Sequence, residues 1–213
     1  MATFAIDDVV RAGVRIGLAD LTVQGVADAL GVTAAAVYRH VPSRSALERL
    51  VGEAILDQLT LVDDPADDTV AHLVGFGRQL RAFTLRHPGS AEYFLRLFPR
   101  GPSGVRLLEH QIAALGRRGY DPAAATVFSS AIATIALGAT VAEQQRQAAT
   151  ADRAATEEAM AAVAASPILR LASAGIPAHT PEDYVVLMLT AAATGLVAQF
   201  PPGRPLTLPT GDR

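Results

Sequence analysis

Between residues 22 and 44 the sequence combines small, polar and basic residues in a pattern that could contact a nucleic acid. Small residues at the start of a helix allow a close approach to base edges, whereas hydroxyl, imidazole and guanidinium groups can reach phosphates. A basic residue at the start of the next helix lies beside a dipole end that itself attracts phosphate. The candidate DNA contacts are Thr22, Gln24, Thr33, Ala34, Ala35, Ala36, Tyr38, Arg39, His40 and Arg44.

This stretch also has a purely structural interpretation, in which it forms an ordinary corner between three packed helices. Any one of the three alanines can simply be a helix former, and exposed basic residues are most often only solvated. We favour the DNA-binding interpretation because a small residue, a glycine and the apolar residues all fall at the spacing that a helix–turn–helix requires.

A second set of residues, in the later part of the chain, could line a cavity for a small molecule. Such cavities are mostly apolar and aromatic, with a few polar groups that orient the ligand. The alternative is that the aromatic residues form the core and that the polar residues are solvated or paired. The candidates are Phe76, Phe83, Tyr93, Phe94, Phe98, His110, Gln111, Phe128 and Gln144.

Catalytic and metal-binding patterns are missing from the sequence. Cysteine is absent, which excludes disulfides and thiolate zinc sites. His72, His87 and His179 are scattered without partners at helical spacing, so we expect no metal cluster. The sequence also lacks a nucleophile elbow, a phosphate-binding loop and a zinc-protease motif. We therefore expect neither an enzyme nor a resident cofactor.

The elements that position these residues are predicted to be helices throughout, which gives an all-α fold. Hairpin signals are missing, and alanine, leucine and arginine dominate. Half of the 213 residues are hydrophobic and the formal net charge is −3, so the chain can bury a core. Any basic surface must therefore be local.

The first part of the chain has the pattern of a helix–turn–helix domain. We predict helices over residues 4–18, 23–30, 33–40 and 44–61, with Thr22 and Ser43 as N-caps. Gly31 supplies the left-handed backbone of the turn, and Ala27 must be small because the second helix crosses over it.

An acidic segment with a proline, residues 63–68, predicts a solvated linker and a domain boundary. We expect a DNA-binding domain over residues 1–62, a helical effector and dimerisation domain over 69–200, and a flexible tail over 201–213. Helices are predicted over 69–85, 90–98, 104–118, 122–150, 167–174 and 181–199, with a polar stretch between the fourth and fifth. The longest apolar run, 131–142, is too short to span a membrane, so we expect a cytoplasmic protein.

Residues 21–32 and 37–47 resemble the DNA-binding domain of the tetracycline-repressor (TetR) family. The resemblance lies in Ala27, Gly31, Tyr38, His40, Arg44 and Leu47, with Arg44 where lysine is usual. More loosely, the later part of the chain is similar to the ligand-binding and dimerisation domain of tetracycline repressors, so that the resemblance covers about residues 5–200. It includes residues 80–81, 85–89, 107–109, 119–120, 137–138 and 143–144.

The resemblance implies a homodimer that is formed through the helices near 122–149 and 181–199. It further implies that this dimer, usually a repressor, binds palindromic double-stranded operator DNA and is released by a small-molecule effector, which we expect to be largely apolar. It implies no metal site, because Phe94 stands where tetracycline repressors hold magnesium through a histidine, and phenylalanine cannot coordinate. The alternative function is a small-molecule binding or scavenging protein with a vestigial DNA-binding domain.

Overall fold

The computed structural model describes residues 4–96, 98–150 and 153–207, and every regular element within these ranges is an α-helix. The predicted all-α fold is therefore confirmed. The helices are α1 (Ile6–Ile16), α2 (Val23–Leu30), α3 (Ala34–Tyr38), α4 (Arg44–Leu56), α5 (Thr69–Arg86), α6 (Ser90–Arg96), α7 (Pro102–Arg117), α8 (Pro122–Ala149), α9 (Arg153–Ala165), α10 (Pro167–Gly175) and α11 (Pro181–Gln199).

Local signals in the sequence set most of the helix starts. Thr22 Oγ1 accepts a hydrogen bond from the Gly25 N–H at 2.9 Å, and Ser43 Oγ accepts one from the Ala46 N–H at 3.1 Å. The prediction for the end of α4 was wrong, because the helix stops at Leu56 and does not continue to residue 61. The chain leaves the helix there in a path that buries the side chains of both Leu59 and Leu61.

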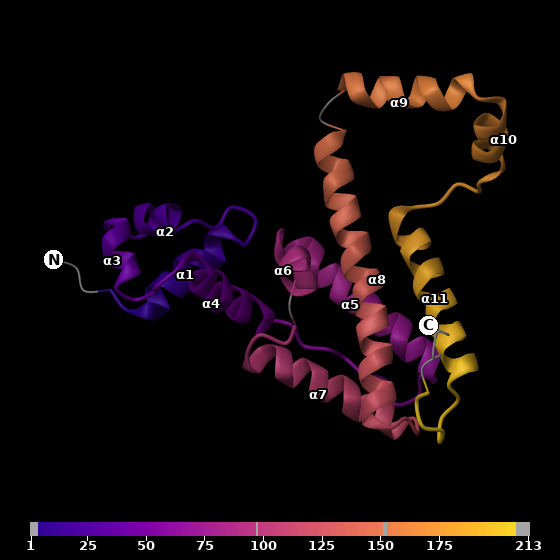
Figure 1. The fold of residues 1–213 in the computed structure, drawn as a ribbon, viewed down its shortest axis with the longest axis horizontal. Helices are drawn as coiled ribbons and strands as arrows, with labels where there is room; N and C mark the ends of the chain where they lie inside the picture. Colours follow the sequence, from indigo (N-terminus) through magenta and orange to yellow (C-terminus); the bar gives the residue numbers. More distant parts are fainter. Residues whose placement is uncertain (1–3, 97, 151–152, 208–213) are drawn as a thin grey trace, which may run out of the picture.

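Helix α8 is the centre of the larger part of the molecule. It packs against α5, α6, α7 and α11, and Figure 1 shows α11 running beside it. By length and composition alone α8 could cross a membrane, a test that core helices also pass. Its contacts with four other helices identify it as a core helix of this fold.

Helices α9 and α10 form an arm that connects the far ends of α8 and α11 (Figure 1). Neither helix has a buried residue. Their exposed side chains include large apolar ones such as Met160, Ile168 and Leu171. The arm is therefore the part of the described chain with the least tertiary support.

The acidic segment after α4 is solvated only in part: Asp64, Pro65, Ala66 and Asp68 are exposed, as the sequence predicts for a linker, but the side chain of its first residue is buried. The Asp63 side chain is only 4% exposed and lies at ion-pair distance from His72, Arg117 and Arg118. The reason is that basic and imidazole groups on α5 and α7 can compensate a buried carboxylate.

Part of the predicted flexible tail also contacts the rest of the chain. The Gly203 N–H donates to the Gly119 carbonyl oxygen at 2.9 Å, and Leu206 packs against the core. Residues 208–213 of this tail lie outside the described residues.

Candidate DNA-binding surface and ligand cavity

Helices α2 and α3 meet in the geometry of a helix–turn–helix. Gly31 has a φ of 66°, and the Val32 N–H donates to the Ala27 carbonyl oxygen at 3.0 Å, which closes the turn. Val26, Ala27 and Val37 are fully buried on the inner side of the corner. The outer side of α3 is therefore the surface that this corner presents.

That outer surface contains most of the predicted DNA contacts. Thr33, Ala35, Arg39 and His40 are exposed, and Tyr38 is 49% exposed. Ala34 is half-buried, and Thr22, Gln24 and Arg44 are exposed at the edges of this surface. Ala36 is buried against the core, so the expectation that it faces DNA is not met.

Several of these polar groups already have partners within the chain. The hydroxyls of Thr22 and Thr33 accept from the N–H groups that begin α2 and α3. Gln24 Nε2 donates to Asp28 Oδ1 at 2.7 Å, and the His40 ring lies 4.7 Å from the Phe4 ring. The two threonines therefore act first as helix caps and fix the orientation of this surface.

Arg44 at the start of α4 pairs with a neighbouring acid. Its Nε donates to Glu48 Oε1 at 3.1 Å, and Glu48 also lies 3.6 Å from Arg96 of α6. Both arginines are well exposed, so a phosphate could replace Glu48 as the partner of Arg44 at little cost.

A cavity of about 270 Å³ lies where the end of α4 and the segment after it meet α5, α6, α7 and α8. Its wall is mostly apolar, with hydroxyl and amide groups contributed by α7 and α8. The lining residues are Leu56, Leu59, Leu61, Phe76, Leu80, Phe94, Leu95, Phe98, Leu107, Leu108, Gln111, Thr126, Ser129, Ser130, Ala133, Thr134 and Leu137.

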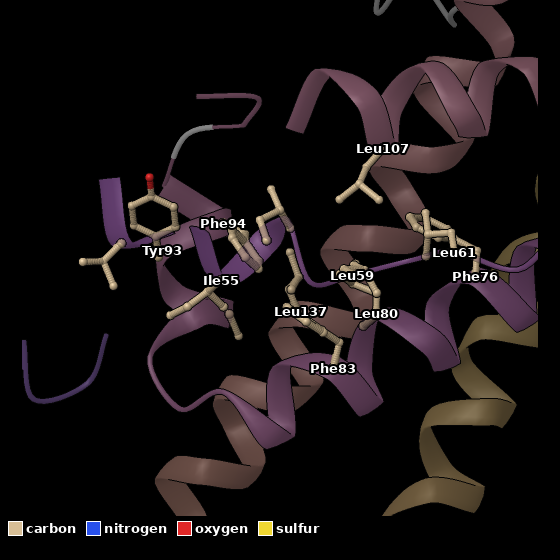
Figure 2. Packing of buried hydrophobic residues seen from close by; sticks show 14 of the residues in the cluster. Ile55, Leu59, Leu61, Phe76, Leu80, Phe83, Tyr93, Phe94, Leu107 and Leu137 are labelled. Atoms are coloured by element: carbon tan, nitrogen blue, oxygen red, sulfur yellow. The ribbon is translucent and has the colours of Figure 1, made fainter. Parts of the chain in front are cut away.

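Of the predicted effector contacts, Phe76, Phe94, Phe98 and Gln111 line this cavity. Figure 2 shows Phe94 and Phe76 among the leucines that surround it, with Tyr93 and Ile55 to one side. The remaining five predicted residues are not among the residues that line this cavity, and as effector contacts they stay a prediction. They are Phe83, Tyr93, His110, Phe128 and Gln144.

The reasons differ between these residues. Phe83 and Phe128 are core residues, and the Phe128 ring packs 5.0 Å from the Tyr120 ring. Tyr93 packs against Gly52 of α4, with the Arg100 guanidinium 4.7 Å above its ring. Gln144 lines a separate, more open depression, together with Ala19 and Pro88 among others.

Sequence reasoning missed the leucines that precede α5 and the hydroxyls of α8. Leu59 and Leu61 fall where a continuous helix was predicted, so their turn into the cavity could not be inferred. The residues Thr126, Ser129, Ser130, Ala133 and Thr134 recur at helical spacing, which places them on one face of α8. That spacing is the sequence signal that could have found this wall.

A buried polar network adjoins the cavity through Gln111, whose Oε1 lies 3.1 Å from His72 Nε2. Burial and the charge of Arg118 lower the pKa of His72, against the opposing effect of Asp63. Burial also raises the pKa of Asp63, but hydrogen bonds from Arg118 and Arg117 outweigh it and hold this pKa well below its usual value. Asp63 is therefore a carboxylate and His72 favours its neutral form.

One known family model covers most of the residues that line the cavity. The family model described as the tetracyclin repressor-like, C-terminal domain matches residues 62–184, more than half of the chain. No curated protein shows significant sequence similarity to the chain.

Solved structures show the same fold over nearly the whole chain. ActR from Streptomyces coelicolor in complex with actinorhodin has a TM-score of 0.77 and 22% identity, covering 93% of this chain and 99% of that one. A possible TetR family transcriptional regulator from Streptomyces coelicolor A3(2) has a TM-score of 0.73 and 23% identity, covering 91% and 99%. A TetR variant from Acinetobacter baumannii AYE in complex with minocycline has a TM-score of 0.65 and 19% identity, covering 92% and 98%.

Proposed function

This chain belongs to the tetracycline-repressor (TetR) family of transcriptional regulators, and on that premise we propose that it is a ligand-released repressor. In this proposal a homodimer binds a palindromic operator, and a small molecule in the cavity lowers its affinity for that DNA. Residues 1–62 would form the DNA-binding domain and residues 69–200 the domain that binds the effector and dimerises.

The exposed outer side of α3 is the observation that carries the proposal. A helix whose first turn presents Thr33 and Ala35 can enter the major groove closely, because these side chains are small. Tyr38, Arg39 and His40 follow on exposed positions from which phosphates can be reached. A packing corner without a ligand would not need this set of side chains.

Dimerisation is supported by exposed apolar side chains on α11. Leu187 is 65% exposed and Tyr184 is also exposed, although α11 otherwise packs on α5 and α8. Apolar surface of this kind marks an interaction site in many proteins. To bind successive turns of duplex DNA, a dimer with its two-fold axis near α8 and α11 would have to hold the two α3 helices about 34–36 Å apart.

The position of the cavity supports control by a ligand. Leu56, at the end of α4, forms part of its wall, while the start of α4 carries Arg44. A ligand that fits one position of α4 better than another shifts the population toward that position by its difference in affinity. The ligand complexes of ActR and of the Acinetobacter TetR variant are consistent with a cavity that takes sizeable organic molecules.

Selection of random duplex DNA by the purified protein tests the proposal. The enriched sequence is then titrated by fluorescence anisotropy at two salt concentrations, with scrambled DNA as the control. We expect an inverted repeat that binds at least a thousandfold more tightly than scrambled DNA, the lower end of the range for specific binding. Uniformly weak, salt-sensitive binding would contradict the proposal and favour a scavenging protein.

A further inference from the structure

A chain of buried polar side chains leads from the cavity to the segment after α4. Gln111 lines the cavity and is 3% exposed, and its Oε1 lies 3.1 Å from His72 Nε2. The other ring nitrogen, His72 Nδ1, lies 2.8 Å from Asp63 Oδ1. Arg118 lies 2.8 Å from the same oxygen, and Arg117 pairs with the other oxygen of the carboxylate.

These contacts fix the position of the proton on His72. A lone pair on Nδ1 would repel the carboxylate at 2.8 Å, so Nδ1 carries a proton, although the approach is not that of a linear hydrogen bond. Because Arg117 and Arg118 already balance the charge of Asp63, the ring needs no second proton. The neutral ring therefore presents Nε2 as a hydrogen-bond acceptor.

The tautomer of His72 in turn orients the Gln111 amide. An acceptor at Nε2 requires the amide to present its NH₂ group there, so the nitrogen must take the place at which the structure has Oε1. A half-turn of the amide makes this exchange with almost no change of shape. No other hydrogen bond to the Gln111 amide is found among the described residues. With its nitrogen held by His72, the amide directs its carbonyl oxygen, an acceptor, toward the cavity.

Ser129 supplies the second polar group of the cavity. It is 3% exposed, it lines the cavity, and its Oγ is buried without a hydrogen-bond partner in the described chain. The neighbouring hydroxyls differ, since Thr126 and Thr134 each donate to a backbone carbonyl of α8. A buried hydroxyl without a partner costs free energy, which a ligand can recover by bonding to it.

We propose that the effector is a largely apolar molecule with a hydroxyl group that donates to the Gln111 carbonyl, and that Ser129 Oγ offers the same molecule a second polar contact. His72 acts as the positioning residue that selects this donor, because it holds the amide in one orientation. This inference rests on the proposed function in one respect only, namely that the cavity is the effector site. An analogue that lacks the hydroxyl proton leaves the Gln111 carbonyl unpaired and binds more weakly.

The first test needs no ligand and uses nitrogen NMR of the full-length protein at neutral pH. We expect the His72 ring to carry its proton on Nδ1 alone, with the Gln111 NH₂ protons close to the ring. A proton on Nε2 would overturn the inference, because the Gln111 oxygen would then face His72 and its NH₂ group the cavity.

The second test measures by calorimetry the affinities of three matched probes: 2-naphthol, 2-methoxynaphthalene and naphthalene. We expect 2-naphthol to bind about fivefold to tenfold more tightly than either analogue, which corresponds to one net hydrogen bond. Equal affinities, or no binding of any probe up to its solubility limit, would overturn the inference.

The variant His72→Asn separates a positioning role from a structural one. The asparagine amide can still donate to Asp63 from the place of Nδ1, but it has no acceptor at the place of Nε2. We expect the preference for 2-naphthol to fall to about twofold or less in the folded variant, since the Gln111 amide becomes free to rotate. An unchanged preference would contradict the role of His72. If the variant does not fold, the NMR test on the wild-type protein still decides.

Operator binding measured on the same samples distinguishes the two proposals. Specific DNA binding together with failed probe tests would leave the repressor proposal standing and overturn only the ligand chemistry. Probe selectivity without specific DNA binding would leave the ligand chemistry standing and overturn the repressor proposal.

Discussion

At the scale of single residues, the proposed DNA surface depends on few cations. Its basic side chains are Arg39, His40 and Arg44, and Arg44 also forms an ion pair with Glu48. The Arg44 side chain is exposed although that of Glu48 is only 17% exposed, so the guanidinium can still reach a phosphate. Tyr38 offers a hydroxyl without charge. These two kinds of contact differ in how they respond to salt.

We predict that Arg44→Ala and Tyr38→Phe weaken operator binding in distinguishable ways. Loss of Arg44 removes one released counterion, so the slope of log affinity against log salt falls by about 1. Loss of the Tyr38 hydroxyl lowers affinity while the slope stays the same, because no charge is removed. Anisotropy titrations at several salt concentrations measure both effects.

Arg153→Ala is the matched control for the charge change, since Arg153 is exposed on α9 and far along the chain from α3. It should leave affinity and slope unchanged. An Arg44→Ala slope equal to that of the wild type would exclude Arg44 as a phosphate contact.

The buried His72 predicts a pH dependence of stability. Its pKa is lowered in the folded state by burial and by Arg118, so the unfolded chain binds the proton more readily. The stability that depends on this group is complete above about pH 6.5 and is lost as the pH falls below that value, by up to about 1.4 kcal/mol per pH unit.

Urea unfolding between pH 5 and pH 8 measures this prediction. The profile of His72→Gln should be flatter than that of the wild type. A wild-type stability that rises as the pH falls below 6.5 would contradict the neutral, buried imidazole.

At the scale of elements, α4 connects the two candidate sites. It packs against α1 and α7, and its last residue, Leu56, lines the cavity. Its middle meets α6 at Gly52, where a Cβ atom would lie 2.4 Å from the Tyr93 ring. The glycine therefore permits a close approach between α4 and α6 that a larger residue would prevent.

We predict that Gly52→Ala lowers the free energy of unfolding by about 1–3 kcal/mol, because the Tyr93 ring must move in a packed interior. The melting temperature should fall by roughly 2–4 °C for each kcal/mol in a chain of this length. Gly75→Ala in α5 is the control, since a Cβ there meets nothing within 4 Å.

The control should be stabilised by about 0.5–1 kcal/mol, as expected when alanine replaces glycine within a helix. Differential scanning calorimetry compares the two variants. Equal melting temperatures would show that α4 and α6 are not in tight contact at this point.

At the scale of the whole molecule, the described chain has an N-terminal group of helices, a larger group around α8, and an arm formed by α9 and α10 (Figure 1). Large apolar side chains are exposed on both α11 and the arm. A single copy would leave this surface in water, at an approximate cost of 25 cal/mol for each Å². A second copy is the simplest partner that covers it.

We predict that Leu187→Glu converts a dimer into a monomer, because it places a charge in the proposed apolar interface. Light scattering at micromolar concentration measures the change. Val62→Glu is the control, since Val62 is also highly exposed but lies outside α8 and α11. A wild-type monomer under the same conditions would contradict the proposed half-site geometry.

The sequence predicted the helical class because its signals are local. Caps such as Thr22 and Ser43, the Gly31 turn and the apolar spacing each act within a few residues, and each reappears in the structure. The Phe76, Phe94 and Gln111 contributions to the cavity were also predicted, because aromatic and amide residues on an amphipathic helix are natural lining groups.

By itself, then, the sequence determined the all-α fold, the helix–turn–helix and the family of this protein. Only the tertiary structure decided that Ala36 is buried, that Tyr93 packs on α4, and that Asp63 belongs to a buried network with His72. The physical reason is the distance along the chain over which each interaction acts. Capping and periodicity depend on neighbours along the chain, whereas burial of a side chain and pairing of a charge depend on helices that lie far apart in sequence and meet only in the fold.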